Sequence, residues 1–260
     1  MVNLNRIDLI NHINRPEEKI SIRKVIDKME SVINSHIPTS TDFLNPHEIN
    51  LSISVLNRFK DNISYKIDGG YEDSELSIIY IYPSYIYENI GSDLVLFKFE
   101  SNKKIKHGDV LGSLIGLSID RGKIGDILIG EKFTYFFVKR EIANFVEINL
   151  NKISKYNIYL SRENGVSDLP KKEYTYKKII VSSFRLDNLI AKVFNISRSK
   201  VKEMISGEFV KVNYAIETRS HIELELNDLV SLRKYGRFRI FDLEGNTKKG
   251  NFVLIVRLNK

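Results

Sequence analysis

The sequence contains no cysteine among its 260 residues. This absence excludes disulfide bonds, thiolate metal sites and a cysteine nucleophile together, and it fits a reducing compartment. The first 14 residues lack the basic start and apolar run of a signal peptide, and no apolar run elsewhere approaches the length of a membrane span. We therefore expect a cytoplasmic protein that does not enter a membrane.

Patterns that carry catalysis or bind metals are scarce as well. The five histidines are scattered, without an HExxH pair or a similar spacing. Residues 108–130 are rich in glycine but lack the spacing of a nucleotide-binding turn that follows a strand. The sequence therefore predicts no cofactor, no metal, no small-molecule substrate and no enzymatic activity.

The charge, by contrast, is informative. Hydrophobic residues make up 42% of the chain and charged residues 28%, which suits two or three globular domains. From Val181 onward there are 15 Lys and Arg against 9 Asp and Glu, whereas the first 180 residues hold 25 against 24. Such a concentration of positive charge favours a polyanionic partner, either nucleic acid or a membrane surface, over a merely solvated lysine-rich face.

Apolar spacing predicts a small α/β domain over residues 1–88. Pro16 opens a helix whose apolar residues recur at helical spacing as far as Ile33. A second helix is predicted around residues 48–59, and two strands at residues 63–67 and 76–82.

The middle region, residues 89–163, has the element order β-α-β-β-α-β of ferredoxin-like and RRM-like domains. The predicted elements, in order, are residues 94–99, 108–117, 126–129, 133–138, 141–153 and 158–160. Phe133, Tyr135 and Phe137 would share one strand face, and with Phe97 and Phe99 they could form a base-stacking platform. Because the glycine-containing RNP1 motif is missing, core packing is the favoured interpretation of these rings.

Residues 164–180 are polar and predict a linker. In the following domain, residues 181–260, Ser182-Ser183 is predicted to cap a helix and Ser197 a second one, which ends at a left-handed Gly207. Strands are predicted at residues 209–213, 221–226 and 229–232, and a basic strand at residues 233–237. Asp187, an acid in a basic domain, is expected to have a structural partner such as a cap or an arginine.

This C-terminal segment resembles the S4 RNA-binding domain. The resemblance is carried by Arg185-Leu186-Asp187, by Ser197-Arg198-Ser199-Lys200 and by Gly207-Glu208-Phe209-Val210-Lys211-Val212-Asn213. Independently of it, a helix start with free N–H groups, a favourable dipole and two cations is suited to phosphate. The predicted RNA-binding residues are Ser183, Arg185, Ser197, Arg198, Ser199, Lys200, Lys202, Lys211, Asn213, Arg233, Lys234 and Arg237.

The whole chain resembles the bacterial YlmH family of ribosome-associated S4 proteins. The motifs that carry this resemblance are Arg15-Pro16-Glu17, Thr41-Asp42-Phe43-Leu44, Gly69-Gly70-Tyr71, residues 107–114, Arg121, residues 124–127, 233–238 and 245–250. The resemblance implies binding to rRNA and tRNA on the large ribosomal subunit, in quality control of stalled peptidyl-tRNA. Glu75-Leu76 stands where the family usually has Glu-Arg, which removes a cation there.

Two other functions remain open. S4 domains also occur in rRNA-modifying enzymes; a pseudouridine synthase would follow its Arg-Leu-Asp closely with Thr-Ser-Gly, whereas Asp187 is followed by Asn188-Leu189-Ile190. The near-neutral first 180 residues could instead make the chain a scaffold that recruits cell-division proteins.

Overall fold

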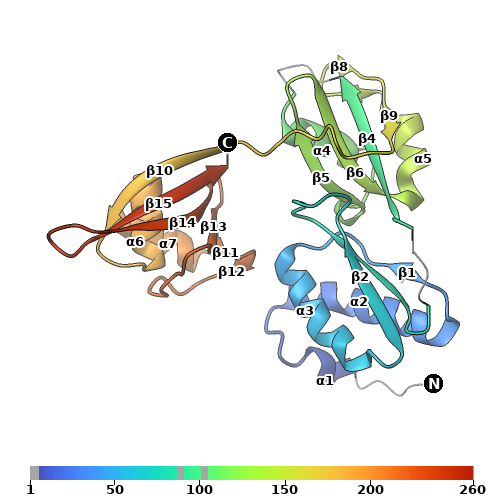
Figure 1. Cartoon of the computed structure of the whole chain (residues 1–260), viewed down its shortest axis with the longest axis horizontal. Helices are drawn as coiled ribbons and strands as arrows, with labels where there is room; N and C mark the ends of the chain where they lie inside the picture. Colours follow the sequence, from blue (N-terminus) through green and yellow to red (C-terminus); the bar gives the residue numbers. More distant parts are fainter. Residues whose placement is uncertain (1–5, 87–90, 101–104, 260) are drawn as a thin grey trace. The chain divides into compact units, whose positions relative to one another are not determined.

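The computed structural model describes residues 6–86, 91–100 and 105–259 of the chain (Figure 1). The fold is mixed α+β and divides into two compact units, Met1–Pro170 and Lys171–Lys260. Both predicted N-terminal domains, residues 1–88 and 89–163, fall within the first unit. Each unit is described by itself below.

The first part of unit 1 packs helices against a three-stranded sheet of order β1-β3-β2. Its elements are α1 (Arg6–Ile10), α2 (Pro16–Ser35), β1 (Thr39–Ser40), α3 (Pro46–Leu56), η1 (Asn57–Phe59), β2 (Ile63–Asp68) and β3 (Ile78–Pro83). Pro16 begins α2 as predicted, and Asn45 and Glu48 form a capping box on α3. α1 and β1 were not predicted, because each is too short to show a period.

The second part of unit 1 contains the predicted elements in their order, with an unpredicted antiparallel pair, β7 and β8, between α5 and β9; the helix predicted at residues 141–153 ends at Asn149. Its elements are β4 (Leu94–Glu100), α4 (His107–Gly116), η2 (Arg121–Lys123), β5 (Ile124–Ile129), β6 (Phe133–Lys139), α5 (Arg140–Asn149), β7 (Lys152–Ile153), β8 (Tyr156–Asn157) and β9 (Ser161–Glu163). The antiparallel sheet has the order β5-β6-β4-β9. The strand predicted at residues 158–160 was misplaced: Ile158 is buried in the core cluster that contains Phe97 and Phe99, and β9 pairs with β4 from Ser161 onward.

The aromatic residues of this sheet divide between its two faces. Phe97 and Phe99 pack against the helices α4 and α5 in one core cluster, on the opposite face from Tyr135 and Phe137. Tyr135 and Phe137 are 4% and 2% exposed, and Phe43 belongs to the cluster that covers them. The predicted rings therefore form no shared platform, and core packing is the correct interpretation for these four.

A buried lysine links the two sheets of unit 1. The side chain of Lys139, at the end of β6, forms an ion pair with Asp93 at 2.8 Å and donates a hydrogen bond to the Thr41 carbonyl at 2.9 Å. Ser40 hydrogen-bonds to both Lys139 and Asp93. Burial alone would raise the pKa of Asp93, but the hydrogen bonds from Lys139 and Ser40 and the positive charge of Lys139 hold that pKa below its usual range.

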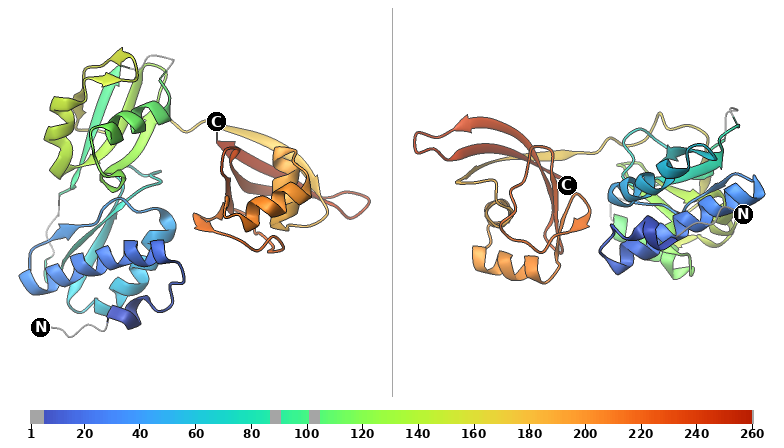
Figure 2. Two further views of the ribbon diagram at one scale, coloured as in Figure 1. Left: turned by 180° about the vertical axis from the view of Figure 1, so that it is seen from behind. Right: turned by 90° about the horizontal axis from the view of Figure 1, so that it is seen from below.

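Unit 2 places two helices on one face of a six-stranded sheet of order β10-β15-β14-β13-β11-β12 (Figure 2). Its elements are β10 (Tyr174–Val181), α6 (Leu186–Phe194), α7 (Arg198–Ser206), β11 (Val210–Val212), β12 (Ala215–Ile216), β13 (Leu229–Leu232), β14 (Gly236–Asn246) and β15 (Phe252–Asn259). The C-terminal part of the predicted linker was wrong, since residues 174–180 pair with β15 along the edge of the sheet.

Four local predictions in unit 2 are corrected. α6 begins after Arg185 rather than at a serine cap. Gly207 has φ −80°, and the left-handed residue is Glu208 at +63°. Residues 221–226 are mostly irregular, with one isolated bridge between Arg185 and Glu223, rather than a strand. Residues 233–235 form a turn between β13 and β14, so the basic strand begins only at Gly236.

Candidate nucleic-acid interface

The first turn of α7 presents an exposed polar and basic surface. Ser197 caps the helix, its hydroxyl accepting the backbone N–H of Lys200 at 3.4 Å and lying 3.2 Å from the Ser199 hydroxyl. The side chains of residues 198–200 and of Lys202 are exposed. A helix start combines backbone donors with the positive end of the dipole. This turn therefore has the chemistry of a phosphate-binding surface.

The carboxylate of Asp187 holds Arg185 and Arg198 in place at this surface. Its carboxylate is fully buried and accepts hydrogen bonds from Arg185 at 3.1 Å and from Arg198 at 2.8 Å. Burial would raise the pKa of Asp187, but the two guanidinium groups outweigh it and hold the pKa below its usual range. The predicted arginine partner is confirmed. Arg198 consequently helps to hold α6 and α7 together in addition to lining the surface.

Two predicted residues lie on the opposite face of the sheet. Lys211 pairs with Ser231, and Ser231 pairs with Arg237, so the three side chains form one row across β11, β13 and β14. Their neighbours Val210, Leu232 and Phe238 point the other way, into the core beneath α6 and α7. Lys211 and Arg237 are therefore separated by the sheet from the start of α7.

The remaining predicted residues have local structural roles. Asn213 donates to Asp228 at 2.7 Å and accepts the Leu229 N–H at 2.9 Å, which fixes the turn after β11. The Ser183 carbonyl accepts a hydrogen bond from Asn188 at 3.0 Å. In the β13–β14 turn, the guanidinium of Arg233 lies over the Phe209 ring, and Lys234 adopts a left-handed φ of 73°.

The boundary between the units sharpens the charge asymmetry. Residues 171–260 hold 19 Lys and Arg against 10 Asp and Glu, whereas residues 1–170 hold 21 against 23. Unit 1 is thus slightly acidic, and the positive charge belongs to unit 2. Lysines 171, 172, 177 and 178 lie in the segment that was predicted as a linker. The charge count from Val181 onward left them out, so it gave a smaller difference between the two parts of the chain.

Several motifs of unit 1 meet at a partly buried junction that the sequence did not predict. The Asp126 carboxylate accepts hydrogen bonds from the Tyr71 hydroxyl and the Glu75 N–H, each at 2.7 Å. Burial and the neighbouring Asp126 raise the pKa of Tyr71. A Cβ at Gly125 would lie 2.5 Å from the Phe43 ring, so this position has room only for glycine. These residues are part of the packing between the two sheets of unit 1.

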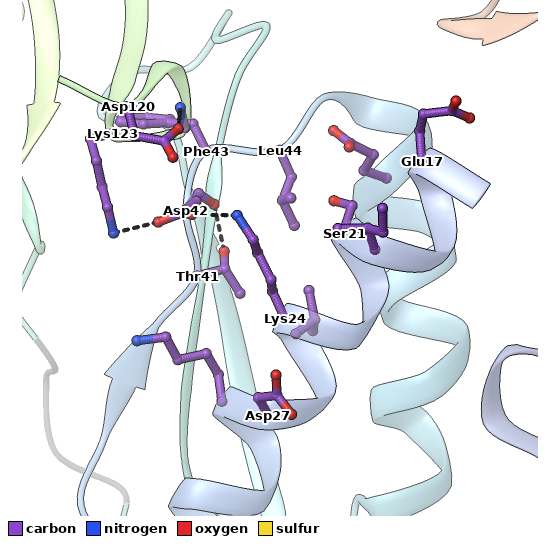
Figure 3. Close-up of a pocket in the computed structure, with 15 residues that line it drawn as sticks. Glu17, Ser21, Lys24, Asp27, Thr41, Asp42, Phe43, Leu44, Asp120 and Lys123 are labelled. Carbon is purple, nitrogen blue, oxygen red and sulfur yellow. Dashed lines mark hydrogen bonds and ion pairs between the residues drawn. The ribbon is translucent and has the colours of Figure 1, made fainter. Parts of the chain in front are cut away.

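A cavity of about 410 Å³ lies beside this junction, between α2 and the loop that contains residues 41–44 (Figure 3). Asp42 forms ion pairs there with Lys123 at 2.6 Å and with Lys24 at 3.8 Å. Burial raises the pKa of Asp42 and lowers that of Lys123, but their mutual contact reverses both shifts. Among the labelled charges, Asp42 is thus paired with both Lys24 and Lys123 (Figure 3).

Neither a metal site nor a membrane helix is found within the described residues. No group of three or more His, Cys, Asp or Glu side chains is placed to hold a metal ion in those ranges. None of the helices described is both long and apolar enough to span a bilayer.

The fold and the basic face define the chain as a two-unit α+β protein with a candidate polyanion-binding surface. Family models described as "Putative RNA-binding domain in YlmH" and "YlmH, N-terminal" match residues 93–166 and 17–86. Ribosome-associated protein quality control protein P2 of Bacillus subtilis (strain 168) is 30% identical over 249 residues, which are 93% of this chain and 95% of that protein. The chain belongs to the YlmH family.

A solved structure supports the fold. Cell division protein ylmH from Streptococcus pneumoniae superposes with a TM-score of 0.53 at 22% identity. The match covers 60% of this chain and 97% of that one.

Proposed function

We propose that this protein binds RNA through the start of α7 in unit 2. The observation that carries the proposal is the exposed turn of Ser197, Arg198, Ser199 and Lys200, with Arg198 held in place by the buried Asp187. Phosphate contacts of this kind provide affinity with little sequence information. The net positive charge of unit 2 would steer any polyanion toward this unit.

The domain assignments belong to the same proposal. Unit 2 is an S4 domain, supported by its helix pair, by the Ser-Arg helix start and by the strand β11 that follows. Residues 89–163 are an RRM-like domain, supported by the strand order β5-β6-β4-β9 and by two helices on one sheet face. With Tyr135 and Phe137 buried, any RNA contact of this domain would use other residues.

The cellular target in the proposal is the large ribosomal subunit. Family membership, and the name of the Bacillus subtilis relative, support a role in ribosome-associated quality control. In the proposal, this role is played on stalled ribosomes that carry peptidyl-tRNA. The protein would contact both rRNA and tRNA and would act without catalysis, as an RNA-binding factor.

The test should spare Arg198, because its loss would also disturb Asp187. A Lys200→Ala, Lys202→Ala double variant removes two exposed cations of α7 and leaves the ion pairs of Asp187 intact. Lys60→Ala, Lys66→Ala, which removes two exposed cations of unit 1, is the matched control. Ribosome co-sedimentation is measured for both variants over a range of salt concentrations.

The α7 variant should bind more weakly and with a shallower salt dependence, by about 0.7–0.9 in logarithmic slope for each phosphate that the protein no longer neutralises. Binding that is unchanged relative to the control would refute the site. Recovery of division proteins without ribosomes in a pulldown would favour the scaffold function instead. Crosslinking and sequencing of the bound RNA would then identify the target.

A further inference from the structure

The sheet of unit 2 carries a group of aromatic rings on the face opposite α6 and α7. Tyr176 and Phe241 are 52% and 44% exposed, and their rings meet edge to face with centroids 5.1 Å apart. Tyr174 lies two residues before Tyr176 on β10, on the same face of that strand. We call Tyr174, Tyr176, Phe241 and Arg257 the ring cluster.

Arg257 lies between the rings of this cluster. Its guanidinium carbon is 4.1 Å from the centroid of Tyr174 and 5.8 Å from that of Phe241. Its Nε is buried and has no hydrogen-bond partner within the described residues. A guanidinium over a ring adds a cation to the aromatic surface.

The surroundings of the ring cluster are basic. The strand pairing places Tyr176, Arg257 and Arg239 in one row across β10, β15 and β14. Arg237 lies two residues before Arg239 and therefore continues the same face. Lys178 forms an ion pair with Glu244 on this face, so both of those charges are neutralised. Arg239 and Arg257 thus outnumber Asp242, the acid at the bulge of β14.

We propose that the ring cluster is a second RNA surface of unit 2, which stacks unpaired bases. Exposed rings next to arginines are the combination that binds single strands, because each base has a π-face and each nucleotide a phosphate. A duplex offers no free base face to such rings. A protein partner would be expected to carry acids against the arginines, whereas RNA satisfies both the rings and the charge.

The proposal does not depend on the start of α7, because the sheet separates the two surfaces. A chain with both could hold a structured RNA on one face and an unpaired segment on the other. The hairpin of β14 and β15, which extends past the helices, would lie along that unpaired segment (Figures 1 and 2).

The test uses the full chain and a fluorescent reporter. The sequence contains no tryptophan, so a Tyr176→Trp variant carries a single one, in the ring cluster. A 12-nucleotide single-stranded RNA and a 12-base-pair RNA duplex are titrated onto it, at lengths of about one single-strand site. Stacking predicts quenching of this tryptophan by the single strand and not by the duplex.

The affinity for the single strand is then compared among variants. Tyr176→Ala, Phe241→Ala should weaken it by about fivefold or more, the loss expected for removal of base stacking on aromatic rings. Ile180→Ala, which removes an exposed aliphatic side chain from the same face of β10, should leave it unchanged. Quenching that persists in a Tyr176→Trp, Lys200→Ala, Lys202→Ala background separates this surface from the α7 site.

Two results would overturn the inference. One is an unquenched tryptophan in the Tyr176→Trp variant together with an unchanged single-strand affinity of the Tyr176→Ala, Phe241→Ala variant. The other is a Tyr176→Ala, Phe241→Ala variant that binds RNA normally but no longer brings a protein partner into ribosome pellets, which would assign the face to protein binding.

Discussion

At the scale of single residues, Asp187 is the group on which the basic surface of α7 depends. Asp187→Asn keeps the size of the side chain but removes the charge that faces Arg185 and Arg198. Hydrogen bonds to charged groups contribute about 1.5–3 kcal/mol each, and since both arginines are partly exposed we expect a total loss of about 2 kcal/mol. Urea unfolding at pH 7 measures it, with the exposed pair variant Glu244→Gln as a near-neutral control.

The lowered pKa of Asp187 predicts that its contribution to stability depends on pH. The folded-state pKa of Asp187 lies below its unfolded value, so its stabilisation is complete above the unfolded pKa of about 4. That stabilisation is lost as the pH falls through the folded pKa. The stability difference between wild type and Asp187→Asn should therefore shrink below pH 4. A difference that stays constant from pH 7 to pH 2.5 would contradict this assignment.

Replacing each of two glycines by alanine should change the stability of unit 1 in opposite directions. Gly70 has φ +86°, and a Cβ there would lie 2.3 Å from the Phe137 ring, so Gly70→Ala should destabilise unit 1 by about 2 kcal/mol or more. Gly112 lies inside α4 with nothing within 4 Å of its Cβ position. Gly112→Ala should stabilise by up to about 1 kcal/mol. Thermal unfolding of both variants checks the pair, and equal effects would argue against the packing described.

At the scale of elements, Lys139 joins the end of β6 to β1 and to the segment before β4. Lys139→Met would leave Asp93 partly buried without its cation, which costs about 3 kcal/mol in comparable buried pairs. Lys98→Met breaks the more exposed pair with Glu163 and should cost less than about 1 kcal/mol. Hydrogen exchange in β1 and β4 should rise in the first variant only. Similar exchange in both would mean that Lys139 is not the link.

Elements whose apolar residues recur at a regular spacing could be predicted from the sequence, and polar or very short elements could not. The spacing from Pro16 to Ile33 predicted α2 because that helix buries one face. β10 was missed because it lies at the edge of the sheet and five of its eight residues are exposed, so its sequence resembles a linker. β9 was misplaced by a few residues, since Ile158 and Leu160 contribute to the core without pairing in the sheet.

The candidate site was predictable where it is local in sequence. Residues 197–200 lie in one helix turn, so their clustering follows from helix geometry. That Lys211 and Arg237 face away from this turn depends on the pairing of β11, β13 and β14. The ring cluster joins residues 174 and 257, whose contact depends on the register of β10 with β15. Long-range strand register of this kind was not visible in the sequence.

At the scale of the whole molecule, the two units should fold independently of each other and should differ in their affinity for RNA. The core of unit 2 draws its buried residues from Ile179 to Val256 alone, so a fragment of residues 171–260 should unfold cooperatively by itself. With 19 basic against 10 acidic residues, it should keep most of the RNA affinity of the full chain at low salt. The fragment of residues 1–170, with 21 against 23, should bind at least about tenfold more weakly, because non-specific affinity follows the cations available to phosphate. Fluorescence anisotropy with one labelled RNA compares the two fragments, and equal affinities would show that RNA binding is not concentrated in unit 2.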